Sequence, residues 1–194
     1  MALTFSWNPT AEQLADYEEL VRDAYFAAFG FTYNEDLYAG YPCETMVCLD
    51  DGQVISGMKV FQCRPDEGIG IPLEKENIDL PAIHGDLYPS QQLYGEVCRV
   101  TIRPGQGQPK LFRAMMFEFY DHFKDGDCRV FYWVSPVGQT RNARQTIRSL
   151  GGLVHYLGGH NVSLGDNSVQ MRLHLSCICF DKDVIVEKVL SQAG

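Results

Sequence analysis

Hydrophobic residues recur with a helical period near the start of the chain. Thr10 followed by Gln13 matches a capping box, in which the two side chains satisfy free backbone N–H groups at a helix start. Gly30 can adopt the left-handed conformation that ends a helix. The spacing therefore predicts a helix from Thr10 to about Phe29. Its apolar stripe consists of Leu14, Tyr17, Leu20, Val21, Ala24 and Ala28.

The pattern changes to that of β-strands after a loop that we expect over residues 31–43. Residues 45–49 and 54–61 read as two strands, and Asp50-Asp51-Gly52 between them contains the Asp-Gly pair typical of a hairpin turn. Residues 63–91 contain four prolines and no clear period. A connection of that length predicts a functional or partly mobile loop.

Strands and helices alternate in the second half of the chain. Pro109 is well placed in the first turn of a helix, where its missing N–H costs nothing. The resulting order predicts one α/β domain over residues 1–194, with a mixed sheet. We expect strands at 93–102, 128–135, 153–157 and 168–180, and helices at 109–123, 139–150 and 183–190.

Composition excludes several classes of protein. No run of about 18 apolar residues could span a membrane, and the N-terminus lacks the basic and apolar segments of a secretory signal. A net charge of −9 argues against nucleic acid as the main partner. The seven cysteines contain no CxxC pair and no zinc-ligand spacing with the five histidines. We therefore expect a cytoplasmic protein with reduced thiols and no metal site.

The charge is distributed unevenly along the chain. Residues 1–98 carry a net charge of −13, whereas residues 99–148 carry +5. A basic segment in an acidic chain indicates a site for an acidic partner or a phosphate-bearing ligand. A helix surface whose arginines pair with the chain's own acids is the alternative.

The segment from Tyr94 to Val100 contains the strongest candidate for chemistry. In a regular strand Glu96, Cys98 and Val100 share one face and Arg99 points to the other. Burial among apolar neighbours favours the neutral form of a carboxyl group, which suits a general base. A structural Glu96, held by a nearby Arg or Lys, is equally compatible with the local sequence.

Three stretches of the chain resemble the autoinducer synthases. These are Arg22 and Phe26 with Phe31 and Asp36 after them, the turn and strand from Asp51 to Lys59, and the Glu-x-x-Arg signature Glu96-Val97-Cys98-Arg99. That family belongs to the Gcn5-related N-acetyltransferase fold and makes acyl-homoserine lactones from acyl-carrier protein and S-adenosylmethionine. The resemblance implies an α/β three-layer sandwich with a mixed, mostly antiparallel central sheet. It also implies an N-acyltransferase.

The resemblance also implies roles for particular residues. Glu96, acting through a water, would take a proton from the substrate amine, with Arg99 beside it. Backbone N–H groups from Val100 to Ile102 would bind the thioester carbonyl and the pantetheine arm. The remaining residues would form the substrate site: Arg22, Asp36, Lys59 and Arg99 around the amine, and Phe26, Phe31, Phe131 and Trp133 along the acyl chain.

The donor that we expect is an acyl thioester on an acidic carrier protein, with no tightly bound cofactor. The stretch from Pro104 to Lys110 does not match the loop by which acetyltransferases hold the pyrophosphate of coenzyme A. A pantetheine arm attached to a protein needs no such loop. The expected docking face combines Arg103, Lys110 and Arg113 with Arg141, Arg144 and Arg148 on the following helix.

Three positions depart from the family pattern: Phe31 replaces a Trp, Ala39 an acid, and Lys59 an Arg. Lys cannot form the two-pronged ion pair of an Arg, so the amine substrate is less defined than the acyl transfer. Three alternatives therefore stay open. They are an N-acyl amino acid synthase, a coenzyme A-dependent N-acetyltransferase and a non-catalytic relative that binds a ligand.

Overall fold

A computed structural model describes most of the chain: residues 3–30, 40–75, 78–85, 88–89, 92–106, 108–164 and 169–180. The helix expected at 183–190 lies outside the described residues, as do the site candidates Phe31 and Asp36 and the departure at Ala39.

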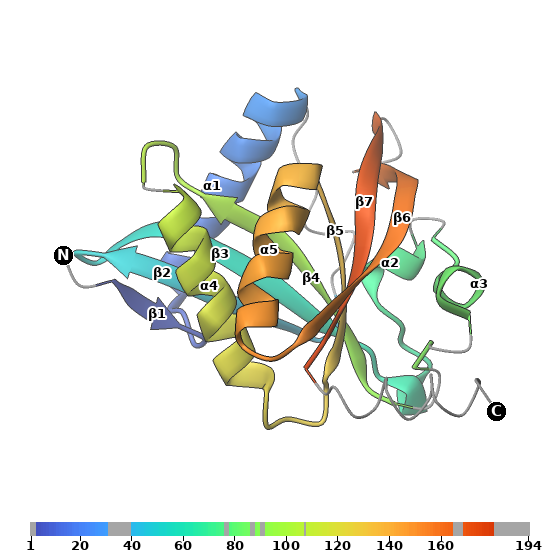
Figure 1. Ribbon diagram of the computed structural model, residues 1–194. Helices are drawn as coiled ribbons and strands as arrows, with labels where there is room; N and C mark the ends of the chain where they lie inside the picture. The colour runs from blue at the N-terminus through green and yellow to red at the C-terminus, as the bar shows by residue number, and fades with distance from the viewer. Residues whose placement is uncertain are drawn as a thin grey trace.

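A seven-stranded sheet forms the centre of the molecule (Figure 1). Its strand order is β1-β2-β3-β4-β5-β7-β6, and every neighbouring pair is antiparallel except β4 with β5. The strands are β1 (Thr4–Ser6), β2 (Cys43–Asp50), β3 (Gln53–Gln62), β4 (Tyr94–Ile102), β5 (Val130–Ser135), β6 (Leu153–Leu164) and β7 (Val169–Cys179).

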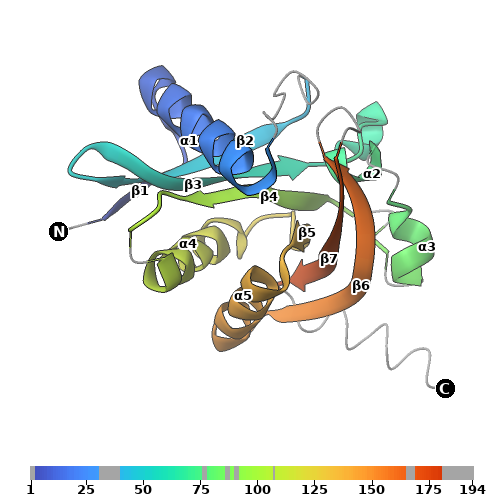
Figure 2. The same cartoon turned by 90° about the horizontal axis from the view of Figure 1, so that it is seen from above.

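Helices cover both faces of this sheet. The long helix α1 (Ala11–Phe29) lies on one face, and α4 (Gln108–Phe123) and α5 (Val137–Ser149) lie on the other (Figure 2). One apolar cluster fills the space between α4, α5 and the sheet, and a second joins the α1 face of β4, β5 and β7 to two short helices, α2 (Pro72–Lys75) and α3 (Leu80–His84). The predicted three-layer α/β sandwich with a mixed, mostly antiparallel sheet is confirmed.

Two local sequence motifs, at the start of α1 and in the β2–β3 turn, form the structures that they predict. At the start of α1 the Thr10 hydroxyl accepts a hydrogen bond from Gln13 N, and Gln13 Oε1 accepts one from Thr10 N. In the β2–β3 hairpin, Asp51 and Gly52 both have positive φ angles, of 49° and 83°. A two-residue turn of this kind matches the twist of the strands that it joins.

The structure differs from the expected elements in three places. The segment 63–91, expected to be a functional or partly mobile loop, contains the 3-10 turn η2 (Pro65–Glu67) and the helices α2 and α3. These elements are too short to show a period. Strand β6 continues to Leu164 instead of ending at 157, across two glycines that interrupt its apolar pattern. Strand β1 has only three residues and was missed.

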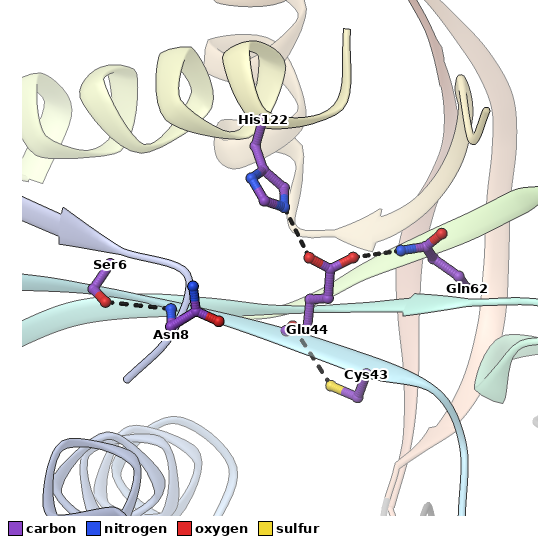
Figure 3. A network of polar contacts seen from close by, with 6 residues as sticks. All are labelled: Ser6, Asn8, Cys43, Glu44, Gln62 and His122. Carbon is purple, nitrogen blue, oxygen red and sulfur yellow. Dashed lines mark hydrogen bonds and ion pairs between the residues drawn. The ribbon is translucent and has the colours of Figure 1, made fainter. Parts of the chain in front are cut away.

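A polar cluster ties the end of α4 to the sheet. His122 Nε2 lies 2.8 Å from Glu44 Oε2, and the Gln62 amide donates to the other carboxylate oxygen at 2.6 Å. Figure 3 shows His122 and Gln62 converging on Glu44 from α4 and β3. The imidazole also stacks on Trp7, with 4.1 Å between ring centres. This cluster lies apart from the cavity described below.

Among the described residues, no helix combines the length and apolar character that a membrane-spanning segment requires.

Candidate functional site

The candidate site lies where β4 and β5 separate. These parallel strands pair only from Tyr94 to Val97 on β4 and from Val130 to Trp133 on β5. Beyond that point β4 continues to Ile102, and the two strands diverge (Figure 1). A cavity of about 250 Å³, here called the main cavity, lies in this opening. Its walls come from α1, β3, β4, β5 and β7 and from the start of α2 and α5.

A β-bulge in β4 shapes one wall of the main cavity. Lys59 pairs with Cys98 and Gly57 with Thr101, so β4 carries one extra residue between these pairs. Arg99 within the bulge has a φ of 53°, which is unusual for a residue other than glycine. Its carbonyl oxygen accepts hydrogen bonds from the buried Tyr17 hydroxyl at 2.7 Å and from the Thr101 hydroxyl at 3.0 Å. These contacts, one of them from α1, stabilise the bulge.

The bulge brings Glu96 and Arg99 to the same cavity. The guanidinium of Arg99 lies 5.8 Å from the ring centre of Phe61, and Phe61 is the partner of Glu96 on β3. Glu96, Arg99 and Phe61 all line the main cavity. The prediction that Arg99 points away from Glu96 was therefore wrong, because the extra residue breaks the alternation of the strand. Val100 changes side as well and packs against the α4 face.

Glu96 is buried and held in place by the backbone of α2. Only 5 % of its surface is exposed, and its Oε2 atom accepts a hydrogen bond from Leu73 N at 2.7 Å. Its neighbour Cys98 also lines the cavity, and burial raises the pKa of that thiol well above its ordinary value. At neutral pH the thiol is uncharged, so the carboxylate is the better proton acceptor of the two.

A second cavity adjoins the first on the α4 and α5 side. This outer cavity has a volume of about 220 Å³ and is lined by Pro109 and Phe112 of α4 and Asn142 of α5. Both cavities share Val100, Ile102 and Gln139 as wall residues. The wall between the two cavities is therefore formed by the open end of β4 and the first turn of α5.

Comparison with known proteins identifies the fold. The sequence matches no protein-family model and no curated protein. Among solved structures the chain is similar to FeeM, an N-acyl amino acid synthase from uncultured soil microbes, with a TM-score of 0.67 at 10% identity over 93% of this chain and 92% of that one. It is also similar to the AHL synthase LasI, with a TM-score of 0.62 at 17% identity over 93% and 89%. An N-acetyltransferase from Staphylococcus aureus Mu50 gives 0.58 at 9% identity over 93% and 99%. The chain has the acetyltransferase fold.

Some of the predicted site residues of this acetyltransferase fold lie at the cavity and others do not. Trp133 lines the main cavity, whereas Phe131 is buried under α4, 4.9 Å from the ring centre of Phe119. Lys59 is buried and pairs with Glu18 of α1 at 3.2 Å. Arg22 and Phe26 lie on the exposed side of α1, where Phe26 is 63% exposed.

The neighbouring face of α1 supplies residues that the sequence analysis did not select. Tyr25 and Phe29 line the main cavity, together with Ala24 and Ala28. Ala24 and Ala28 belong to the predicted apolar stripe, and their small side chains leave room beside the sheet. Pro72 of α2 completes this wall. A four-residue helix gives no periodic signal, so its part in the site could not be found from the sequence.

The predicted docking cations lie on the other side of the sheet. Lys110 and Arg113 are exposed on α4, and Arg141, Arg144 and Arg148 are exposed on α5. None of these five forms an ion pair with the described part of the chain. Arg103 differs from them, because its guanidinium donates to the Val54 carbonyl at 3.1 Å.

Proposed function

We propose that this protein is an N-acyltransferase that moves an acyl group from a thioester to the amine of an amino-acid-derived substrate. The observation that carries the proposal is the convergence of Glu96 and Arg99 on one cavity where β4 leaves β5. A buried carboxylate supplies a base, and a guanidinium at the same cavity supplies a partner for a substrate carboxylate. The adjoining outer cavity offers a path for the thioester arm.

In the proposed reaction the substrate amine attacks the thioester carbonyl carbon. Glu96 takes one amine proton through a water molecule, because only a neutral amine is nucleophilic. Backbone N–H groups between Val100 and Ile102 stabilise the negative charge on the carbonyl oxygen. The new C–N bond forms and the C–S bond breaks. The attacking nitrogen loses its second proton to the departing thiolate, which leaves as a thiol, and Glu96 returns its own proton to the medium.

An acidic acyl-carrier protein is the donor that we favour over free coenzyme A. The five cations of α4 and α5 that form no ion pair with the described residues lie on the side of the sheet where the outer cavity opens. Charges of this kind accelerate the encounter with a partner of opposite sign. Similar structures include acetyltransferases with coenzyme A bound, so coenzyme A thioesters are the comparison in each test.

The test is to express the protein in a bacterium and search the extract by mass spectrometry for new N-acyl compounds. Purified protein is then assayed with matched acyl-carrier and acyl-coenzyme A donors, and thermal shift compares binding of the two. We expect an N-acyl product that is formed faster from the carrier. Tight ligand binding with no acylated product from a broad panel of thioesters and amines would contradict the proposal.

A further inference from the structure

We propose that Glu74 is a positioning residue for Glu96. Glu74 does not line the main cavity, and nothing in the sequence separates it from the other acids of the segment 63–91. Its carboxylate holds the turn whose backbone N–H contacts Glu96. The inference rests on the proposed function, since it concerns the base of that reaction.

The contact that matters is the one between α2 and Glu96. Leu73 N donates to Glu96 Oε2 at 2.7 Å, across 23 positions of the chain. A backbone donor of this kind favours the charged carboxylate and fixes its orientation. Its position depends on α2, which has only four residues and cannot hold its own shape through helical hydrogen bonds.

Glu74 supplies the support that α2 lacks. Its Oε2 atom accepts a hydrogen bond from Ile71 N at 2.9 Å and so closes the turn on itself. Its Oε1 atom accepts one from the Tyr88 hydroxyl at 2.9 Å, and both oxygens lie 3.1 Å from the Tyr94 hydroxyl. Tyr94 belongs to β4 and precedes Glu96 by two residues. The carboxylate therefore links α2 to the strand that carries the base.

Both tyrosines remain donors over the whole working range of pH. Burial raises the pKa of Tyr88 to about 12, and it raises the pKa of Tyr94 further. The two hydroxyls also lie 2.9 Å apart. Since the described residues place no cation against Glu74, neutral donors hold its carboxylate.

The carboxylate of Glu74 occupies the space beside Gly70. A Cβ atom at residue 70 would lie 2.2 Å from Glu74 Oε2. Any other residue at position 70 must therefore displace the carboxylate. Ile71 and Leu73 are fully buried on either side of Pro72, which lines the main cavity. Movement of Glu74 is thus transmitted to the cavity wall and to Leu73 N together.

The first experiment compares Glu74→Gln with Glu67→Gln. Glu67 lies in the same segment, is exposed and pairs with Arg64, so it controls for loss of one acid. An amide has only one acceptor oxygen, so when that oxygen accepts from Ile71 N, the NH₂ group faces the tyrosine hydroxyls and can no longer accept from them. We expect Glu74→Gln to lower kcat about tenfold with little change in KM for the thioester. The acid limb of the kcat/KM profile should move to higher pH, because Glu96 loses a donor that favours its charged form.

An NMR readout separates this inference from the proposed function. In the wild type the Leu73 amide shift should follow the titration of Glu96, and this response should vanish in Glu96→Gln. Glu74→Gln should displace the titration and speed amide exchange at Leu73. Tyr88→Phe, which keeps the carboxylate, should act in the same direction with a smaller effect.

The results can distinguish failure of the proposed base from failure of the positioning role. If Glu96→Gln retains full turnover, the proposed base is wrong, whatever Glu74 does. If Glu96→Gln loses turnover while Glu74→Gln keeps the wild-type kcat, pH profile and Leu73 titration, only the positioning role is overturned. A fall in melting temperature without any change in these three readouts would also overturn it, because it would assign Glu74 to stability alone.

Discussion

Charged side chains differ in burial and in hydrogen bonding between the two sides of the sheet opening. On the α1 and α2 side, Glu96 and Glu74 are at least half-buried and accept hydrogen bonds from backbone N–H groups and tyrosines. On the α4 and α5 side, cations such as Arg144 and Arg148 are exposed and form no ion pair with the described residues. The first arrangement fixes a group in one geometry, and the second leaves charge available to a partner.

Under the proposed function, this difference suits the two sides to different steps. A buried group with fixed hydrogen-bond partners is suited to a reaction step, since its position is set before the substrate binds. Exposed charges act on the rate of encounter and are screened by salt. Substitutions on the two sides should therefore separate chemistry from docking.

The largest expected effect comes from Glu96→Gln. The amide keeps the shape of the side chain but cannot take a proton, so acylation should fall by about 10²-fold or more with carrier and coenzyme A donors alike. Steady-state kinetics and a melting curve measure this. Glu19→Gln, at an exposed position of α1, is the control and should keep full activity. A loss of activity restricted to the carrier donor would assign Glu96 to docking. The two sides of the sheet would then no longer differ in function.

The same substitution at two glycines compares close packing within the sheet with the exposed surface of α5. A Cβ at Gly95, next to Glu96, would lie 2.7 Å from the Phe61 carbonyl oxygen and 2.8 Å from the Phe131 ring, whereas at Gly138 of α5 it meets nothing within 4 Å. We expect Gly95→Ala to reduce the free energy of unfolding by about 1–3 kcal/mol. Gly138→Ala should raise it by up to about 1 kcal/mol, because alanine favours the helix. Urea titration measures both, and equal effects would contradict the difference in packing.

Much of the fold could be predicted from the sequence, because long elements carry periodic signals. The capping box at Thr10 and the Asp51-Gly52 turn each fix a boundary by local hydrogen bonding or backbone conformation. The site was harder to predict. The bulge at Arg99 depends on Tyr17, which is 82 positions away, so no local pattern reveals that Arg99 joins Glu96. The role of α2 likewise depends on contacts with β4 that its four residues do not encode.

Charge reversal on α5 tests the docking side. Arg144→Glu with Arg148→Glu should lower kcat/KM for an acyl-carrier donor about tenfold and leave the value for acyl-coenzyme A within about twofold. The wild-type preference for the carrier should also shrink as salt is added. Arg64→Glu with Lys124→Glu changes the net charge equally, and both residues already pair with acids, so this variant is the control. Equal losses with both donors would remove the docking surface.

The smallest expected effect is a change in the pKa of His155 on β6, which responds to the positive charge of Arg148. Burial lowers the pKa of His155, and the positive charge of Arg148 lowers it further. Arg148→Ala should therefore raise this pKa and still leave it below the ordinary value, since burial remains. An acidic carrier docked over Arg148 should raise it in the wild type for the same electrostatic reason. NMR titration of the imidazole measures both shifts, with Arg113→Ala on α4 as the control. If the pKa of His155 is unchanged in Arg148→Ala, solvent screens the exposed cations even from neighbouring residues. These cations could then not attract an acidic partner, and the proposed electrostatic docking would be wrong.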